Sequence, residues 1–437
     1  MCFEGPDLYS QAGGLGVRMT GLSRSLAEAG FLTHLIFVGD PGLPGREDLC
    51  DGKLVLHRWC QWISQYHPEG VYQAEESKLY DFNRTVPWHI LDNLVRPALA
   101  TGRRTVIMGE DWHTAHCLAE TSDLLHYNGL RHHALMTWNA NNPMGFEKID
   151  WARLNYVSFL TTVSRYMKHY MWRLGVNPVV IPNGIPGSLL VPPPVKEALR
   201  LRRALVSSDL LLVKVGRWDP DKRWNMAVDA VAQLRAVGER PSLLARGGIE
   251  PHEGEVLHNA RLRGLTIKDI RVDIPTTGSL AAELEKAGPA DVYNLKFFVP
   301  PELLRVLYHA ADAVLANSGM EPFGLVGLEV MAAGGVAFTG ATGEDYARAF
   351  ENAIVLETDD PSEIVSYAAY LRHNPKEAER LRESARETAR KYTWDGVVKQ
   401  LVSRLEFLGL KSLVVPGKTK CEAREEIPVE TGPKSAR

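Results

Sequence analysis

The feature that most constrains this chain is an alternation of strand-like and helix-like stretches that occurs in two blocks. Residues 11–39, "QAGGLGVRMTGLSRSLAEAGFLTHLIFVG", show it: a glycine loop, a segment with helically spaced apolar residues, and a short β-rich run. Strands that alternate with helices are typical of a parallel sheet covered by helices. The sequence therefore predicts an α/β protein.

A proline-rich segment, "PGSLLVPPPVKE" over 186–197, separates the two blocks and reads as a linker. We predict two tandem Rossmann-like, doubly wound domains with a deep cleft between them, an N-terminal domain over 1–185 and a C-terminal domain over 186–392. The predicted strands before the linker lie in 33–39, 103–111, 133–141, 159–164 and 179–184. Those after it lie in 209–219, 241–248, 312–318, 335–340 and 352–357.

The C-terminal part reads as one or two helices over 375–409, followed by a charged tail that contains proline and glycine. We predict that the tail, 411–437, is largely disordered, because it offers little apolar surface to bury.

Composition excludes several classes of protein. The 437 residues carry a formal net charge of −3, which gives no global attraction to nucleic acid. The five cysteines show no CxxC spacing, which argues for a reducing compartment and against disulfides or structural zinc. No apolar run reaches the length of a membrane span, and no signal peptide is visible. We expect a cytoplasmic protein.

The first stretch that can carry chemistry is the glycine loop with Gly13, Gly14 and Gly16. Glycines let the backbone approach an anionic ligand, and a helix start offers free N–H groups. A tight turn without any ligand explains the cluster equally well. The spacing is not GxGxxG, so a nicotinamide enzyme is disfavoured.

The second stretch, "KVGRWDPDKRWN" over 214–225, places Arg217 and Lys222 directly after a buried strand. Open α/β sheets bind ligands at the carboxyl ends of their strands, and these two cations suit phosphate oxygens. The alternative is a solvated surface loop that binds no ligand. Asp219-Pro220-Asp221 looks superficially like a metal-binding pair, but its place between two basic residues favours a loop role.

The third stretch, "SGMEPFGLVGLEVMAAGG" over 318–335, sets Glu321 and Glu329 around an apolar segment. We predict a helix from about Phe323, with Gly324 and Leu325 at its start. Such a start can hold a diphosphate while the carboxylates accept hydroxyl protons from sugars. The alternative is a capping Glu321 and a Glu329 that forms a salt bridge in the core.

Three further stretches follow predicted strands. His113 lies in "EDWHTAH", Asn139 and Asn141 in "TWNANNPMGF", and Arg165 in "SRYMKHYMW". The amides and Arg165 are candidates for binding sugar hydroxyls at the cleft. A lone histidine is more often structural, and the asparagines also fit an Asx-rich turn.

Together these motifs resemble the retaining glycosyltransferases of the two-Rossmann-domain GT-B fold, the group that holds glycogen synthases, sucrose synthases and many bacterial enzymes. "EPFGLVGLE" before "MAAGG" resembles the family's Glu-x7-Glu motif, and "GRWDPDKRW" its phosphate loop, with Arg223 where glycine is usual. "AGGLG", "DWHT" and "IPNGI" resemble its donor loop, its "DWH" and the end of its first domain. The resemblance covers about residues 9–410.

The resemblance implies a role for each matched residue. Arg217 and Lys222 hold the donor diphosphate, and Gly13, Gly14 and Gly16 approach the phosphate. Glu329 binds the ribose hydroxyls, while Glu321 and His113 contact the transferred sugar. Phe323, Gly324 and Leu325 belong to the donor site. The family's last helix crosses back to the first domain, which residues 393–410 fit.

The implied reaction keeps the anomeric configuration, and the leaving diphosphate takes the acceptor proton. Neither a metal nor a cofactor is expected beyond a donor, which we take to be a UDP- or ADP-hexose of glucose type. Two departures bear on the acceptor. Gln11-Ala12 stands where glycogen synthases have a lysine, and Trp138-Asn139 stands where many relatives have His-Asn. A soluble small molecule or saccharide is the favoured acceptor.

Two other functions remain open from the sequence. One is a nucleotide-sugar epimerase of the same fold, for which no set of acid and base residues facing a sugar ring is visible. The other is a catalytically silent nucleotide-sugar binding protein, which the intact Arg217, Lys222, Glu321 and Glu329 disfavour.

Overall fold

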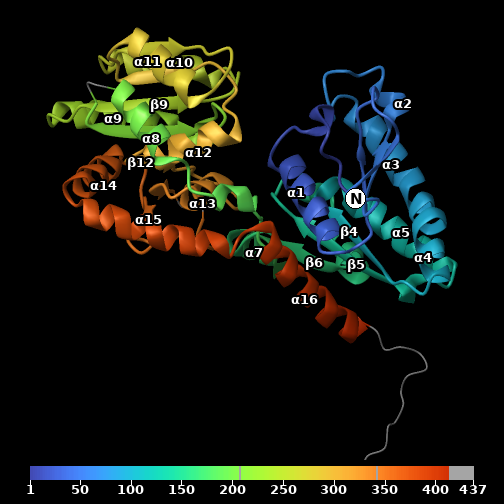
Figure 1. Ribbon diagram of the computed structural model, residues 1–437. Helices are drawn as coiled ribbons and strands as arrows, with labels where there is room; N and C mark the ends of the chain where they lie inside the picture. The colour runs from blue at the N-terminus through green and yellow to red at the C-terminus, as the bar shows by residue number, and fades with distance from the viewer. Residues whose placement is uncertain (206–207, 341–342, 413–437) are drawn as a thin grey trace, which may run out of the picture.

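The computed structural model describes residues 1–205, 208–340 and 343–412, and it shows two α/β regions side by side (Figure 1). The C-terminal region is built on a seven-stranded sheet with the order β10-β11-β9-β8-β12-β13-β14, in which every recorded pairing is parallel. Its strands are β8 (Leu210–Val215), β9 (Pro241–Arg246), β10 (Ile267–Ile270), β11 (Val292–Leu295), β12 (Ala313–Ala316), β13 (Ala337–Thr339) and β14 (Ile354–Val355). The doubly wound architecture predicted from the sequence is thus confirmed.

The N-terminal region holds two hydrogen-bonded sheets, ordered β1-β3-β2 and β4-β5-β6-β7. Their strands are β1 (Thr33–Val38), β2 (Arg46–Leu49), β3 (Leu54–Trp59), β4 (Thr105–Glu110), β5 (Ala134–Ala140), β6 (Phe159–Thr162) and β7 (Val179–Val180). The extended residues 1–3 join the sheets, because Cys2 N–H donates to Ile36 O on β1 and Glu110 N–H on β4 donates to Met1 O.

Helices pack around the sheets of both regions (Figure 1). The N-terminal region has α1 (Gly14–Glu28), α2 (Gln61–Ser64), α3 (Glu75–His89), α4 (Arg96–Ala100), α5 (Ala115–Tyr127), α6 (Trp151–Val157) and α7 (Arg165–Trp172). The C-terminal region has α8 (Val195–Ala204), α9 (Trp224–Ala236), α10 (His252–Leu262), α11 (Thr277–Ala287), α12 (Pro301–Ala310), α13 (Leu325–Ala332), α14 (Pro361–His373) and α15 (Pro375–Arg390). The last helix is α16 (Trp394–Ser412).

The central strand β8 shows why the C-terminal sheet needs helices on both faces. Successive side chains of a strand point to opposite faces, so an uninterrupted apolar run buries both of them. Leu210 and Leu212 pack in one hydrophobic cluster, which includes side chains of α9, α10 and α14. Leu211 and Val213 pack in the other, which includes side chains of α8, α11 and α12. Strand β8 is thereby buried on both faces, and its carboxyl end is the part that lies closest to water.

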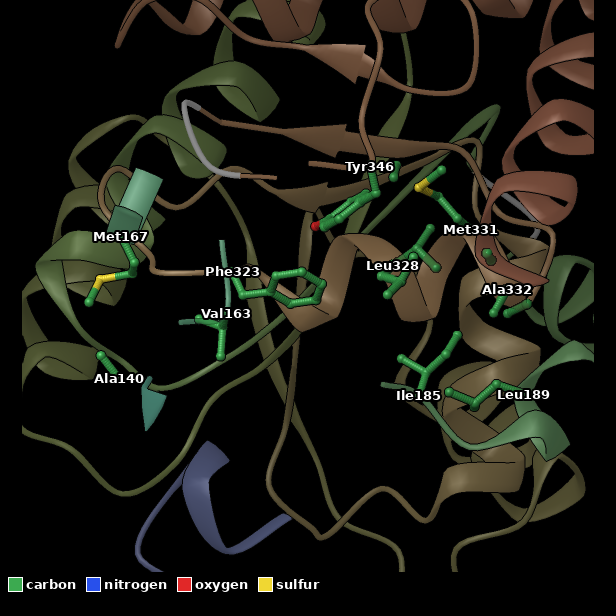
Figure 2. Packing of buried hydrophobic residues seen from close by; sticks show 14 of the residues in the cluster. Ala140, Val163, Met167, Ile185, Leu189, Phe323, Leu328, Met331, Ala332 and Tyr346 are labelled. Carbon is green, nitrogen blue, oxygen red and sulfur yellow. The ribbon is translucent and has the colours of Figure 1, made fainter. Parts of the chain in front are cut away.

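Phe323 lies where the two regions meet (Figure 2). In that view its ring lies between Val163 of the N-terminal region and Leu328 on α13. It is 4% exposed, and its ring centroid is 5.6 Å from that of Tyr346. One hydrophobic cluster therefore runs from the N-terminal region into the C-terminal region.

Several details differ from the sequence-based expectations, and four strands, β2, β3, β10 and β11, were not predicted. Helix α13 begins at Leu325 rather than Phe323, because Gly324 takes the left-handed conformation with φ 77° and ends the preceding loop. Helix α8 begins inside the proline-rich segment, at Val195. Helix α16 continues through residues 411–412, and the remainder of the predicted tail, 413–437, lies outside the described residues.

Helix α16 returns to the N-terminal region, as the family resemblance implied. Trp394 N–H donates a hydrogen bond to Ile185 O at 3.1 Å, and Ile185 N–H donates to Tyr392 O at 2.9 Å. The indole of Trp394 fits between two glycines: a Cβ on Gly21 would lie 2.2 Å from its Nε1, and a Cβ on Gly184 would lie 2.4 Å from its Cδ2. Trp394 is therefore the side chain through which α16 is anchored on α1.

Replacing this anchor should destabilise the protein strongly. We predict that Trp394→Ala lowers the free energy of unfolding by about 3–5 kcal/mol, because a buried indole leaves a cavity that two glycines cannot refill. Urea unfolding followed by fluorescence measures it. Tyr156→Ala is the control, since Tyr156 is 91% exposed and should cost little. Equal losses in the two variants would contradict the anchoring role.

Candidate functional site

The C-terminal half of the site lies where β8 and β12 end. These strands are neighbours in the sheet, so the loops that follow them meet at its carboxyl edge. Gly319 N–H in the second loop donates to Asp221 O in the first, at 2.8 Å. The two motifs, 99 residues apart in sequence, thus form one surface.

Lys222 and Glu321 form an ion pair across the two loops, with 2.8 Å between Nζ and Oε1. Their side chains are 20% and 26% exposed, so the pair is only partly screened by water. The Arg217 side chain is 67% exposed, and its recorded ionic contact is Asp219 at 3.7 Å. Its guanidinium is therefore free to reorient toward an anion.

Glu329 lies one turn into α13, partly buried, and its carboxylate forms no hydrogen bond or ion pair with the described residues. Burial, and secondarily the charge of Glu321, raises its pKa to about 7. The hydroxyl of Tyr308, whose pKa is raised by burial and by Glu329, is buried without a hydrogen-bond partner among the described residues. Of the two, the partly exposed Glu329 has hydrogen-bonding capacity that a ligand with hydroxyl groups would satisfy.

The three residues before and at the start of α13 shape this surface. Gly324 is the N-cap, and its carbonyl accepts a short hydrogen bond from the Tyr346 hydroxyl. Phe323 points into the core between the two regions, while Leu325 stays partly exposed. Of the three predicted donor-site residues, Phe323 therefore serves packing, Gly324 is buried beneath Tyr346, and only Leu325 is partly exposed.

Lys214 is a group of this site that the sequence analysis missed. It is 2% exposed at the end of β8, where its Nζ donates to Leu315 O at 3.1 Å and, by a short bond, to Asn317 Oδ1. Burial, and secondarily the charge of Lys222, lowers its pKa to about 7. A lysine in the otherwise apolar run "LLLVKV" was the signal that could have identified it.

The glycine loop of the N-terminal region is bound by a carboxylate of the chain itself. Glu4 Oε2 accepts hydrogen bonds from the N–H groups of Ala12 at 3.3 Å, Gly13 at 3.2 Å and Gly16 at 2.9 Å. Its Oε1 accepts from the Tyr72 hydroxyl at 2.6 Å. Glu4 thus occupies the anion position that the sequence analysis gave to a phosphate, which a helix N-terminus favours electrostatically. Gly14 begins α1 and stays exposed.

His113 is buried in an aromatic stack and tied to a carboxylate. Its ring lies 3.9 Å from that of Trp112 and 4.3 Å from that of Phe3, and its Nε2 lies 2.7 Å from Glu75 Oε1. Burial lowers its pKa, although Glu75 acts in the opposite direction. The other nitrogen, Nδ1, is buried without a partner among the described residues. That nitrogen is the one left for a ligand.

The asparagines predicted to bind an acceptor are used inside the protein. Asn139 is 2% exposed, and it donates to Glu110 at 2.9 Å and accepts from the Thr161 hydroxyl at 2.9 Å. Asn141 Nδ2 donates to the same Glu110 oxygen at 2.8 Å. The structure thus gives both amides the task of compensating a buried carboxylate. The sequence could not show this, because it does not reveal what lies next to a strand end.

Arg165 contacts the other region rather than an open pocket. Its Nε lies 3.1 Å from Asp345 Oδ1, and its guanidinium donates to Glu344 O at 2.7 Å. Its side chain is 57% exposed. Arg165, predicted to bind an acceptor, thus links the two regions in this structure.

Neither a metal centre nor a membrane segment was found in the part of the chain that the structure describes. Among residues 1–205, 208–340 and 343–412, no group of three His, Cys, Asp or Glu side chains could hold a metal ion. Over the same ranges, no helix combines the length and apolarity needed to cross a membrane.

The chain is similar to known proteins. A model of the family "Glycosyl transferases group 1" matches residues 195–388. A D-inositol 3-phosphate glycosyltransferase of Geodermatophilus obscurus is 26% identical over 423 residues, which cover 90% of this chain and 84% of that protein. A protein of the same name from Thermomonospora curvata is 34% identical over 125 residues, 28% of each chain.

Two solved structures are similar over nearly their whole length. The sucrose-phosphate synthase of Thermosynechococcus elongatus gives a TM-score of 0.63 at 19% identity, covering 92% of this chain and 94% of that one. The catalytic domain of starch synthase IV of Arabidopsis thaliana gives 0.65 at 17% identity, covering 94% and 98%. The fold is therefore that of the GT-B enzymes. The chain is a glycosyltransferase, and its residues 195–388 are a group 1 glycosyltransferase domain.

The raised pKa of Glu329 makes stability depend on pH. A glutamate in an unfolded chain titrates near 4.5, so between about pH 4.5 and about 7 the folded protein keeps a proton that the unfolded chain has lost. Stability from this group is therefore present at low pH and lost as the pH rises through that window. We predict that Glu329→Gln, which removes the effect, gains up to about 3 kcal/mol over the wild type by pH 8.

Urea unfolding of both proteins from pH 4 to pH 8 measures this difference. Glu76→Gln, at an exposed glutamate on α3, is the control and should track the wild type at every pH. A Glu329→Gln variant that is less stable than the wild type at pH 8 would show that Glu329 has a partner when ionised.

Proposed function

We propose that this protein is a retaining hexosyltransferase that moves a hexose of glucose type from UDP or ADP to a hydroxyl acceptor. The observation that carries the proposal is the group formed by Lys222, Glu321 and the unpaired Glu329 around the start of α13, within the residues that the family model matches. A cation held by one carboxylate beside a second, unpaired carboxylate suits a ligand that has phosphates at one end and hydroxyls at the other.

Each side chain then has one task. Arg217 and Lys222 stabilise the negative charge that develops on the departing diphosphate, which is the main electrostatic demand of such a transfer. Before the donor binds, the charge of Lys222 is balanced by Glu321. When the donor phosphate binds, either this ion pair breaks or both side chains contact the donor. Glu329 accepts hydrogen bonds from ribose hydroxyls, and Glu321 and His113 contact the transferred sugar.

The chemical step balances without a protein base. The bond between the anomeric carbon and the donor phosphate oxygen breaks, and the acceptor oxygen bonds to the same face of that carbon. The acceptor hydroxyl proton passes to the leaving phosphate oxygen. In this mechanism no metal ion takes part, and the positive charge comes from Arg217 and Lys222 together with backbone N–H groups.

The glycine loop has a specific part in the proposal. Its N–H groups are bound to Glu4, so a donor phosphate either displaces this carboxylate or binds beside it at Gly14, the exposed first residue of α1. Displacement frees a carboxylate that Tyr72 still holds by its hydroxyl. Donor binding and the position of Glu4 are then coupled.

The two phosphate-binding cations can be tested by nucleotide affinity. We predict that Arg217→Ala and Lys222→Ala each weaken binding of the preferred nucleoside diphosphate by about 10- to 100-fold, since a charge-assisted hydrogen bond is worth about 1.5–3 kcal/mol. Calorimetric titration measures it. Arg240→Ala is the matched control, because Arg240 pairs with Asp209 at the opposite edge of the sheet. Unchanged affinity in either site variant would show that the phosphate assignment is wrong.

The donor and the stereochemistry can be tested together. A thermal-shift panel of UDP, ADP, GDP and their hexose conjugates identifies the nucleotide, because a ligand of the folded state raises the melting temperature. We expect UDP or ADP to shift it, and proton NMR of the product to show the donor's anomeric configuration, with EDTA causing no loss. An inverted product, or activity lost to EDTA and restored by a metal ion, would contradict the mechanism.

A further inference from the structure

A cavity of about 720 Å³ opens in the N-terminal region beside the glycine loop. It is lined by three segments, 8–12, 40–41 and 68–73. The second of them follows β1, so the cavity lies at the carboxyl end of that strand, and His113 follows the carboxyl end of β4 in the other sheet of this region. Its volume is in the range of small-molecule sites in proteins.

Two lining residues connect this cavity to the glycine loop. Ala12 lines it and donates its N–H to Glu4, and Tyr72 lines it and donates its hydroxyl to the same carboxylate. The carboxylate in turn holds Gly13 and Gly16. A molecule bound in the cavity therefore adjoins the loop against which the donor phosphate is proposed to lie.

The charged side chains that line this cavity are all acidic. Its two ionisable carboxylates belong to Asp40 and Glu69, and its 12 lining residues include no lysine, arginine or histidine. The remaining polar groups are tyrosines and amides, together with backbone. Gln11, the residue that replaces the lysine of the glycogen synthases, is among them.

A lysine lies beneath the cavity, but its charge is already used. Lys78 is fully buried, and its Nζ donates to the Tyr9 hydroxyl at 2.7 Å and to the carbonyls of Gly70 and Val71, each at 3.1 Å. An ammonium group has three donors, so none is left for a ligand. Lys78 instead fixes the loop that forms one wall of the cavity.

We propose that this cavity is the acceptor site and that it takes an uncharged polyhydroxyl compound, a saccharide or a polyol, rather than a sugar phosphate. This rests on the transferase function proposed above. Carboxylates and amides exchange hydrogen bonds with hydroxyl groups, and the faces of Tyr9 and Tyr72 suit the apolar C–H faces of a sugar ring. A phosphate would meet two carboxylates and no cation, which is a repulsive arrangement.

A second, smaller cavity provides the competing prediction. It has a volume of about 250 Å³ and is lined by His113, Lys148 and Arg153, among others. Arg153 is bound to Glu120 at 2.9 Å and to Asp123 at 2.6 Å, and the Lys148 ammonium lies 4.0 Å from the Trp112 ring centre. Its cations are thus largely occupied, but of these two cavities it is the one that offers a cation to a phosphorylated acceptor.

Pairs of acceptors that differ only in a phosphate group can distinguish the two candidate acceptor cavities. Transfer from the preferred donor is measured to glucose and glucose 6-phosphate, fructose and fructose 6-phosphate, and myo-inositol and its 3-phosphate. We expect the best acceptor to be an uncharged one, with kcat/KM at least tenfold above that of its phosphate ester. Equal or better use of the phosphorylated partner would overturn the proposal and favour the smaller cavity.

A charge reversal tests the location. Glu69→Lys places a cation in the lining and should raise the use of the phosphorylated partner relative to the neutral one at least threefold. Glu69 is exposed, so the variant should fold. Glu76→Lys makes the same change of charge at an exposed position of α3 that does not line the cavity, and it should leave the ratio unchanged. Equal responses of the two variants would overturn the assignment of this cavity.

Donor measurements keep the two proposals apart. If nucleotide raises the melting temperature and donor sugar is hydrolysed, but no neutral acceptor is used, the acceptor proposal fails and the donor site stands. If no nucleotide binds, the transferase function itself fails. In wild type and both variants, nucleotide affinity should agree within about twofold, because Glu69 and Glu76 lie outside the donor site.

Discussion

The buried ion pair between Arg18 and Glu110 is the interaction on which the N-terminal half of the site depends. The two side chains are 3% and 0% exposed, and 3.1 Å separates Arg18 Nε from Glu110 Oε2. Burying two charges costs several kcal/mol per ion unless hydrogen bonds complete their shells. Here Asn183 accepts from Arg18 at 2.6 Å, and Asn139 and Asn141 donate to Glu110. The amides at the ends of β5 and beyond β7 are thus needed for the pair to be tolerated.

This network determines where the glycine loop lies. Arg18 is on α1, only a few residues after the loop, while Glu110 ends β4 and is followed by the segment that carries His113. The ion pair therefore fixes the position of the glycine loop relative to His113. Asp111, next to Glu110, is held with φ 58°, and burial raises its pKa to about 7, so strain and desolvation collect at this strand end. Such features gather where binding geometry matters more than local stability.

The C-terminal half brings cations together instead. Lys222 pairs with Glu321, and burial together with the charges of Lys222 and Arg223 lowers the pKa of Lys214. Arg223, which takes the place of a glycine in the family motif, adopts the left-handed conformation with φ 53° and pairs with Asp359 at 2.5 Å. A glycine at this position would relieve the backbone strain but could not form the ion pair. An anion that enters here meets charges that are held in place before it arrives.

Much of the architecture followed from the sequence, because hydrophobic periodicity depends on local spacing. Apolar runs such as "LLLV" predicted β8, and the linker and the returning helix were recognisable from proline content and motif resemblance. The contact between Lys222 and Glu321 was also foreseeable, since both follow strands whose carboxyl ends share one sheet edge. The start of α13 was predicted two residues too early, because the left-handed Gly324 cannot be read from the pattern of apolar residues.

What the sequence by itself determined is therefore the class of fold, the place of the strand ends, and the residue types that stand there. Only the tertiary structure decided which of those polar groups face a ligand and which face each other. Glu4 binds the glycine loop, Glu75 binds His113, and Asn139 lies against Glu110, although no motif links the members of these pairs. The physical reason is that buried polar atoms must find partners in space, and distance along the chain does not restrict that choice.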